Sequence, residues 1–256
     1  MEKINHLYRK RIGFPEDETL TFKNLPVVLE KTAMTIPFEN FCVIAGDQSE
    51  LNEQSVTEKI LHRNEGGLCY ELNAMLYLFL KENGFDVQLF RGVVFEQASN
   101  SFTPTGRTHV TILLNHEGGK YLVDTGFGGN VPLQPVPLDG TEVSTRNGEY
   151  RVKKEDSEYG DSLLELKLKH KDPGWRKGYA FDTQKPVEDF DELNEVKEII
   201  TWHPESHFRE RPLMTKFTED GTITLTEASF TQWKNGEMTK EEISPEQFEK
   251  LLKKYF

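Results

Sequence analysis

The stretch NEGGLCYELNAMLYLFLKENG, residues 64–84, contains the clearest helical pattern in the chain. The prediction of the fold starts from this helix. Gly66 and Gly67 can adopt backbone angles closed to other residues, so they permit a sharp entry into a helix. Gly84 stands where a left-handed C-terminal cap is expected. We therefore predict a helix with Cys69 in its first turn. Its apolar residues recur at helical spacing: Leu72, Met75, Leu76, Phe79 and Leu80.

The position of Cys69 at a helix N-terminus has two interpretations. Unpaired N–H groups and the helix dipole favour a negatively charged sulfur there, and the same N–H groups could hold a developing oxyanion. A free cysteine is also commonly a small buried apolar residue, and for Cys69 alone neither interpretation is preferred. Cys42, in ENFCVI, has apolar neighbours and is predicted to be such a residue.

The bulk properties limit the classes of partner. The chain has 256 residues, enough for a substantial core, and a net charge of −12 with no cluster of Lys and Arg. Nucleic-acid backbones and membranes are therefore not expected partners. Neither a signal peptide nor a transmembrane stretch is recognisable. The two cysteines are too few for a disulfide framework, so we expect a cytoplasmic protein with free thiols.

Beyond the helix the periodicity changes. FDVQLF (85–90) alternates, and THVTILLNHEGGKYLVDTGF (108–127) is typical of two strands around a turn with Gly118 and Gly119. A further strand pair is expected over residues 214–233, and Ser244 and Gln247 form a capping box for a terminal helix. A helical region, a β region and a mixed terminal part together predict an α+β fold.

His109 and Asp124 form a candidate pair within the predicted hairpin. Asp124 lies among apolar residues, where an ionised carboxylate is costly unless it is paired. If Leu114 lies opposite Gly119 around the loop NHEG, His109 lies directly opposite Asp124, with Cβ atoms about 5 Å apart. A slip of one residue would send Asp124 to the other face. Together with Cys69 they suggest a triad with a thiol nucleophile.

Two weaker signals accompany this pair. The glycine-rich GFGG (126–129) could expose N–H groups to a phosphate, although such a cluster is commonly only a tight turn. His203 and His207 are spaced like a zinc pair, but Pro204 lies between them and no third ligand is near. We therefore predict no metal site.

Several motifs together resemble those of the arylamine N-acetyltransferases. GGLCYELN (66–73) resembles the active-site signature of that family, with an Asn four residues after the Cys. IPFEN (36–40) resembles the segment upstream of it, and YRKRIGF (8–14) also fits. GRTHV (106–110) and LVDTGFGG (122–129) resemble the strands that carry the His and the Asp, and PESHF (204–208) fits loosely.

The resemblance implies a fold in three parts, related in its core to cysteine proteinases and transglutaminases. A helical bundle over residues 1–86 would carry the nucleophile. A central antiparallel β-barrel over 87–196 would carry the His and the Asp. An α/β lid over 197–256 would cover the site.

The resemblance also implies a ping-pong reaction. Cys69 would take an acetyl group from acetyl-CoA, His109 would act as its base, and Asp124 would orient His109. The acceptor would be an aromatic amine, hydrazine or N-hydroxyarylamine, as in xenobiotic metabolism, and the protein a monomer or homodimer. The amine pocket would be lined by Phe38, Val94 and Phe127, and CoA would lie along Thr105, Gly106, Gly126, Phe127, Gly128 and Gly129.

One residue departs from the family pattern. The family typically has Arg immediately before the two glycines, where it pairs with the Glu of the PFEN segment, here Glu39. This chain has Glu65 at that position and Arg63 two residues earlier. Two facing carboxylates would repel each other or share a proton, so either Arg63 substitutes or this corner is rebuilt. His207 stands where the family often has Ser.

Three other functions fit the same residues. The triad could serve a cysteine hydrolase, such as a peptidase or a transglutaminase-like enzyme. It could also serve an acyltransferase that forms amides from a larger acyl chain. A binding module without catalysis would leave Cys69 no more reactive than free cysteine.

Overall fold

The structure is a computed structural model and describes residues 3–256, so Met1 and Glu2 of the predicted helical bundle lie outside the described residues. The N-terminal part is helical and contains one short strand. A turn of π-helix, η2, directly continues α4. The elements are α1 (Ile4–Ile12), η1 (Phe22–Asn24), α2 (Leu25–Thr35), β1 (Phe38–Glu39), α3 (Phe41–Ile44), α4 (Glu53–Thr57), η2 (Glu58–His62) and α5 (Cys69–Glu82).

The middle of the chain forms an antiparallel sheet in the order β6-β5-β4-β2-β10-β9-β8-β7, with β3 paired to β2. Strands β6 and β8 also contact each other, so the sheet is nearly closed into a barrel. The elements are β2 (Asp86–Glu96), β3 (Ser101–Phe102), β4 (His109–His116), β5 (Gly119–Val123), η3 (Gly128–Asn130), β6 (Val136–Pro137), β7 (Val143–Thr145), β8 (Gly148–Ser157), β9 (Gly160–Leu168) and β10 (Arg176–Pro186).

The C-terminal part forms a second antiparallel sheet, in the order β1-β11-β12-β13-β14. The N-terminal strand β1 pairs with β11 and so ties this sheet to the helical part. The capping box of Ser244 and Gln247 is confirmed at the start of α7. The elements are α6 (Phe190–Trp202), η4 (His207–Arg209), β11 (Leu213–Thr218), β12 (Gly221–Thr226), β13 (Ser229–Lys234), β14 (Glu237–Glu242) and α7 (Pro245–Tyr255).

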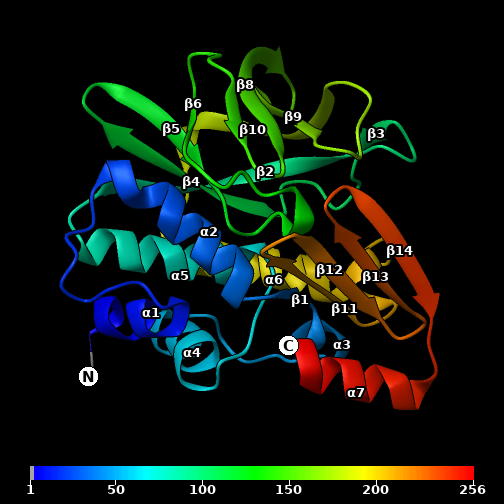
Figure 1. The fold of residues 1–256 in the computed structure, drawn as a ribbon. Coiled ribbons are helices and arrows are strands. Elements are labelled where there is room, and N and C mark those ends of the chain that lie inside the picture. Colours follow the sequence, from blue (N-terminus) through cyan, green and yellow to red (C-terminus); the bar gives the residue numbers. More distant parts are fainter. Residues whose placement is uncertain (1–2) are drawn as a thin grey trace.

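The predicted α+β class is confirmed. Figure 1 shows the N-terminal helices stacked beneath the barrel, with the second sheet beside them and α7 at its lower edge. Helix α5 begins at Cys69 as predicted, and it packs against β2 and β4. It contributes ten buried residues, and its N-terminus reaches the junction of helices, barrel and second sheet.

The hairpin of β4 and β5 forms with a different register from the predicted one. His116 lies opposite Gly119, and the turn is the residue pair Glu117 and Gly118, both with positive φ. A two-residue turn of this kind matches the twist of the flanking strands better than the predicted four-residue loop. His109 is therefore not directly opposite Asp124. The difference is two residues, which preserves the face, so both side chains still lie on the same side.

The division into three parts at residues 86 and 196 stays a prediction, and residue 196 lies within α6. Over the described part of the chain, no helix combines the length and the apolar character that crossing a membrane requires.

Candidate active site

Cys69 is the first residue of α5, and close backbone packing fixes its position. A Cβ atom on Gly66 would lie 2.1 Å from the carbonyl oxygen of Pro37, and one on Gly67 would lie 2.7 Å from Oε2 of Glu71. Only glycines therefore fit the approach to Cys69. The thiol is 6% exposed, and its sulfur lies 3.4 Å from the carbonyl oxygen of Thr108, one residue before His109.

His109 and Asp124 form a buried pair. Nε2 of His109 lies 2.8 Å from Oδ2 of Asp124, which leaves Nδ1 as the ring nitrogen available to Cys69. Burial alone would lower the pKa of His109, but the charge of Asp124 and hydrogen bonds with Asp124 and Cys69 outweigh it and raise the pKa to about 10. An imidazolium is therefore held beside the sulfur of Cys69.

Asp124 accepts four hydrogen bonds. Oδ2 accepts from His109 and from the hydroxyl of Tyr179 at 2.7 Å. Oδ1 accepts from Nδ2 of Asn73 at 2.8 Å and from the amide of Gly126 at 2.7 Å. Burial would raise the pKa of Asp124, but His109, Asn73 and Tyr179 hold it below the ordinary value. The carboxylate therefore stays ionised although it is fully buried.

Asn73 connects the helix to both strands that carry the pair. It lies one turn after Cys69 on α5 and is fully buried. Besides Asp124, its Nδ2 donates to the carbonyl oxygen of Val110 at 2.7 Å, and its Oδ1 accepts from the amide of Thr125 at 2.9 Å. This side chain thereby fixes α5 relative to β4 and to the segment after β5.

The sequence predictions assigned no role to Asn73 or Tyr179. For Asn73 a signal was available, because its spacing of four from Cys69 places both on one face of a helix. For Tyr179 there was none, since β10 reaches the site through the pairing of β10 with β2. The ring of Tyr179 packs on that of His109 with centroids 4.2 Å apart.

The segment after Asp124 passes directly over the start of α5. A Cβ atom on Gly126 would lie 2.5 Å from Cα of Cys69 and 2.8 Å from Nδ2 of Asn73. Gly128 has a φ of 56°, the left-handed region that favours glycine. Within GFGG, Gly126 is thus required by close approach and Gly128 by backbone conformation.

A cavity of about 380 Å³ opens above the triad. Cys69 and His109 line it, and so do all the predicted substrate and cofactor residues except Gly106. Phe208, Ile200 and Leu213 also line it and were not predicted as site residues. The rings of Phe38 and Phe208 meet edge to face, with centroids 5.8 Å apart. The walls are therefore largely apolar and aromatic, while the thiol and imidazole lie among them.

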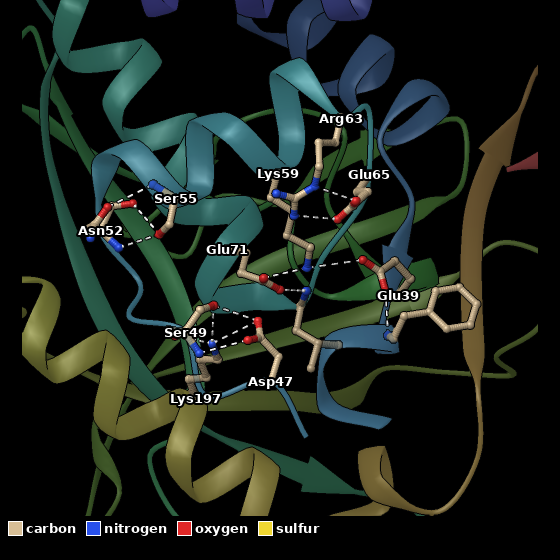
Figure 2. A network of polar contacts seen from close by, with 12 residues as sticks. Glu39, Asp47, Ser49, Asn52, Ser55, Lys59, Arg63, Glu65, Glu71 and Lys197 are labelled. Atoms are coloured by element: carbon tan, nitrogen blue, oxygen red, sulfur yellow. Dashed lines mark hydrogen bonds and ion pairs between the residues drawn. The ribbon is translucent and has the colours of Figure 1, made fainter. Parts of the chain in front are cut away.

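The corner around Glu39 is rebuilt in a way that the sequence predictions did not include (Figure 2). Lys59 on η2 lies 3.3 Å from Glu39 and 2.6 Å from Glu71. Arg63 does not take this place, because it pairs with Glu65 at 2.7 Å on the surface. Of the two expected alternatives, substitution by Arg63 is wrong and the rebuilt corner is confirmed, with Lys59 as the cation beside Glu39. The spacing could have indicated the burial of Lys59, because it lies three residues after the buried Val56 and so on the same face of the helix.

Cys42 also differs from its prediction as a buried apolar residue. It is half-buried and close enough to Lys59 and Glu71 for their charges to act on its thiol. Burial raises the pKa of this thiol. Among residues 3–256, no three His, Cys, Asp or Glu side chains are grouped in a way that could hold a metal ion.

Comparisons with known proteins agree with this architecture. A family model described as N-acetyltransferase matches residues 21–256. YvcN of Bacillus subtilis (strain 168), an uncharacterized acetyltransferase, is 38% identical over 248 residues, covering 96% of this chain and 95% of the relative.

Solved structures give the same result. One similar structure is an arylamine N-acetyltransferase from Bacillus cereus, described as having a unique Cys-His-Glu catalytic triad. It matches with a TM-score of 0.94 and 37% identity, covering 100% of this chain and 98% of that one. The Mycobacterium marinum arylamine N-acetyltransferase in complex with CoA matches with a TM-score of 0.80 and 25% identity, covering 93% and 86%. The chain therefore belongs to the arylamine N-acetyltransferase family and is an acyltransferase.

Proposed function

We propose that this protein transfers the acetyl group of acetyl-CoA to small aromatic amines by a ping-pong reaction through Cys69. The observation that carries the proposal is the placement of Cys69 and His109 at one wall of an apolar cavity, with the fully buried Asp124 paired to His109. Membership of the family supports the acetyl transfer, and the CoA complex of the Mycobacterium marinum relative supports CoA as the carrier.

In the first half-reaction the thiolate of Cys69 attacks the thioester carbonyl of acetyl-CoA. The carbonyl oxygen gains negative charge, and the amides of Cys69 and Tyr70, the first two residues of α5, are suited to stabilise it. The bond to the CoA sulfur then breaks, and the imidazolium of His109 can give its proton to that sulfur. Acetyl-Cys69 and free CoA result.

In the second half-reaction an amine attacks the acetyl-Cys69 carbonyl. The nitrogen must lose a proton, and neutral His109 accepts it. The C–S bond then breaks, which releases the amide and restores the thiolate and imidazolium. Asp124 holds the imidazole throughout and stabilises its charged form.

The cavity favours a neutral aromatic acceptor. Phe38, Val94 and Phe127 line it on the proposed amine side, and arylamines are uncharged at neutral pH, so apolar walls suit them. Thr105 and the turn of Gly128 and Gly129 also line the cavity and are the proposed contacts of the CoA arm. Hydrazines also have a nucleophilic nitrogen, and N-hydroxyarylamines have a hydroxyl group on the nitrogen. Both classes therefore belong to the proposed acceptors.

Intact mass spectrometry tests this function. After incubation with acetyl-CoA alone, the protein should gain one acetyl group, and addition of 4-methoxyaniline should remove it and yield the acetylated amine. Cys69→Ala should gain none. A wild-type protein that gains no acetyl group but cleaves peptide substrates would instead be a cysteine hydrolase. Preference for longer acyl-CoA donors would indicate an acyltransferase for a larger acyl chain.

A further inference from the structure

We propose that Lys59 is a positioning residue for the Cys69 nucleophile, acting through the two carboxylates that its ammonium group joins. Lys59 touches neither the triad nor the cavity, yet it joins two segments that fix the backbone before Cys69. This inference rests on the proposed function, because it concerns how the nucleophile of that reaction is held.

Glu71 holds one side of the segment. Its Oε2 accepts a hydrogen bond from the amide of Leu68, the residue before Cys69, at 2.9 Å. Its Oε1 lies 2.6 Å from Nζ of Lys59. Lys59 therefore orients the carboxylate that caps the first turn of α5, and a rotation of this carboxylate would release the amide of Leu68.

Glu39 holds the other side. Its backbone amide donates to the carbonyl oxygen of Gly67 at 3.0 Å, and the amide of Gly67 donates to the carbonyl oxygen of Pro37 at 3.1 Å. Its side chain accepts from the amide of Phe41 at 2.6 Å and contacts Lys59 at 3.3 Å. The strand β1 and the glycine segment are thereby joined edge to edge, and Lys59 fixes the carboxylate at their junction.

The three charges are almost completely buried, which makes the arrangement sensitive to loss of any member. The side chains of Lys59, Glu39 and Glu71 are 7%, 4% and 6% exposed. Burial would lower the pKa of Lys59, but Glu71 and Glu39 outweigh it and raise the pKa above its ordinary value. Removal of the ammonium would leave two buried carboxylates close together, a situation that proteins avoid by rearrangement or protonation.

Displacement of this segment would act on the chemistry through geometry. The backbone of Cys69 lies directly against Gly126, and the segment of Gly66 and Gly67 that leads into it packs on Pro37, Glu39 and Glu71. The sulfur must lie within hydrogen-bond reach of Nδ1 of His109 for the imidazole to act as its base. A misplacement of about 1 Å can cost about 10²-fold in rate.

Lys197 provides a matched control, because it is also a buried lysine paired with an acidic residue. Its side chain is 10% exposed, and its Nζ lies 3.5 Å from Asp47 and also donates to Ser49 (Figure 2). It lies on α6 and bonds neither Glu39 nor Glu71. Loss of Lys197 should therefore cost stability without changing the segment before Cys69.

The experiment compares Lys59→Met with Lys197→Met in full-length protein, at a temperature where circular dichroism shows both to be folded. Two rates are measured: alkylation of Cys69 by iodoacetamide at pH 7, and CoA release in the first turnover with acetyl-CoA. Because Lys59 acts on the Cys42 thiol, Cys69→Ala is introduced into each variant separately as its blank for Cys42. For Lys59→Met both rates should fall by about tenfold to 10²-fold. Lys197→Met should stay within about twofold of wild type.

A folded Lys59→Met protein with wild-type rates would overturn the proposal. Lys59→Arg retains the positive charge and should react faster than Lys59→Met, and equal rates would also overturn it. If Lys59→Met does not fold, Glu39→Gln removes one of the two contacts and should still slow alkylation, whereas no change would contradict the inference. The alkylation rates do not depend on acetyl-CoA. A protein that is never acetylated would therefore refute the proposed function, while the alkylation rates would still test the role of Lys59.

Discussion

The hydroxyl of Tyr179 lies 2.7 Å from Oδ2 of Asp124, the same oxygen that lies 2.8 Å from Nε2 of His109. The hydroxyl also lies 3.1 Å from Oγ1 of Thr111, and the tyrosine ring packs on the imidazole. Burial raises the pKa of Tyr179 well above its ordinary value, so the hydroxyl stays protonated and donates. Tyr179 thus supports the ionised form of Asp124 and the orientation of His109 together.

Tyr179→Phe should remove the hydrogen bond and keep the ring. A hydrogen bond to a charged group contributes about 1.5–3 kcal/mol, so acetylation of Cys69 should slow by about tenfold to 10²-fold. Tyr150→Phe is the matched control, because that buried hydroxyl donates to the carbonyl oxygen of Val131 at 3.0 Å outside the triad. Rapid-quench measurement of CoA release should show the loss only in Tyr179→Phe. Equal losses in the two variants would refute the assigned role.

Asn73→Asp should damage both stability and activity although it barely changes shape. The substitution replaces the donor that faces Oδ1 of Asp124 and the carbonyl oxygen of Val110 with an oxygen. Acceptors would then face each other in a buried site, and we expect the free energy of unfolding to fall by about 3 kcal/mol. Urea unfolding measures this, and an unchanged midpoint would show that Asn73 does not connect the helix to the strands.

Gly126→Ala should be poorly tolerated because its Cβ would lie 2.5 Å from Cα of Cys69. The obstacle is backbone, which cannot rotate away, so we expect a loss of about 1–3 kcal/mol and slower alkylation of Cys69. Gly174→Ala is the control, since its Cβ would have nothing within 4 Å. Thermal unfolding of both variants, with iodoacetamide kinetics, distinguishes close approach from a general effect of replacing glycine. Similar behaviour of both would contradict the packing argument.

The pair of His109 and Asp124 should give stability a defined pH dependence. The folded pKa of His109 is raised from 6.5 to about 10, so its contribution is fully present below pH 6.5 and is lost as the pH rises through about 10. The folded pKa of Asp124 is lowered below 3.8, so its contribution is present above that pH and is lost as the pH falls through the lowered value.

Urea unfolding of wild type and His109→Gln across pH 5 to pH 10 measures the first contribution. The stability difference between them should be largest at pH 5 to 6 and should shrink steadily toward pH 10. A difference that grows with pH would mean that His109 is neutral in the folded protein.

Arg63→Ala should have little effect. Its contact with Glu65 lies on the surface, where both side chains are nearly half exposed, and such pairs contribute about 0–1 kcal/mol. Stability and activity should therefore stay close to those of wild type. A large loss of stability or activity would indicate that Arg63, and not Lys59, supports the corner around Glu39.

The face shared by His109 and Asp124 was predictable from the sequence, and the register was not. Side-chain direction has a period of two along a strand, so an error of two residues in the turn leaves the face unchanged. The turn itself depends on Glu117 adopting a positive φ, which its residue type does not favour. Helix α5 was predictable because the periodicity, the preceding glycines and the following Gly84 agree with one another.

The support around the triad was less accessible to sequence reasoning. Tyr179 comes from a strand that is far from His109 in the chain, and only the sheet order brings them together. A lysine on a helix is usually solvated, and the burial of Lys59 depends on two carboxylates from separate segments, so local pattern does not predict its role. Local pattern thus predicts the proposed reacting groups, while long-range packing determines what holds them.

The most direct test of the central claim is to locate the transferred acetyl group. The protein is mixed with isotopically labelled acetyl-CoA, quenched at low pH, digested and sequenced by tandem mass spectrometry. The label should be on Cys69 alone, should be absent in Asp124→Ala at short times, and should pass to 4-methoxyaniline on addition of the amine. Label on Cys42 or on lysines, unaffected by Cys69→Ser, would contradict the triad as the catalytic centre.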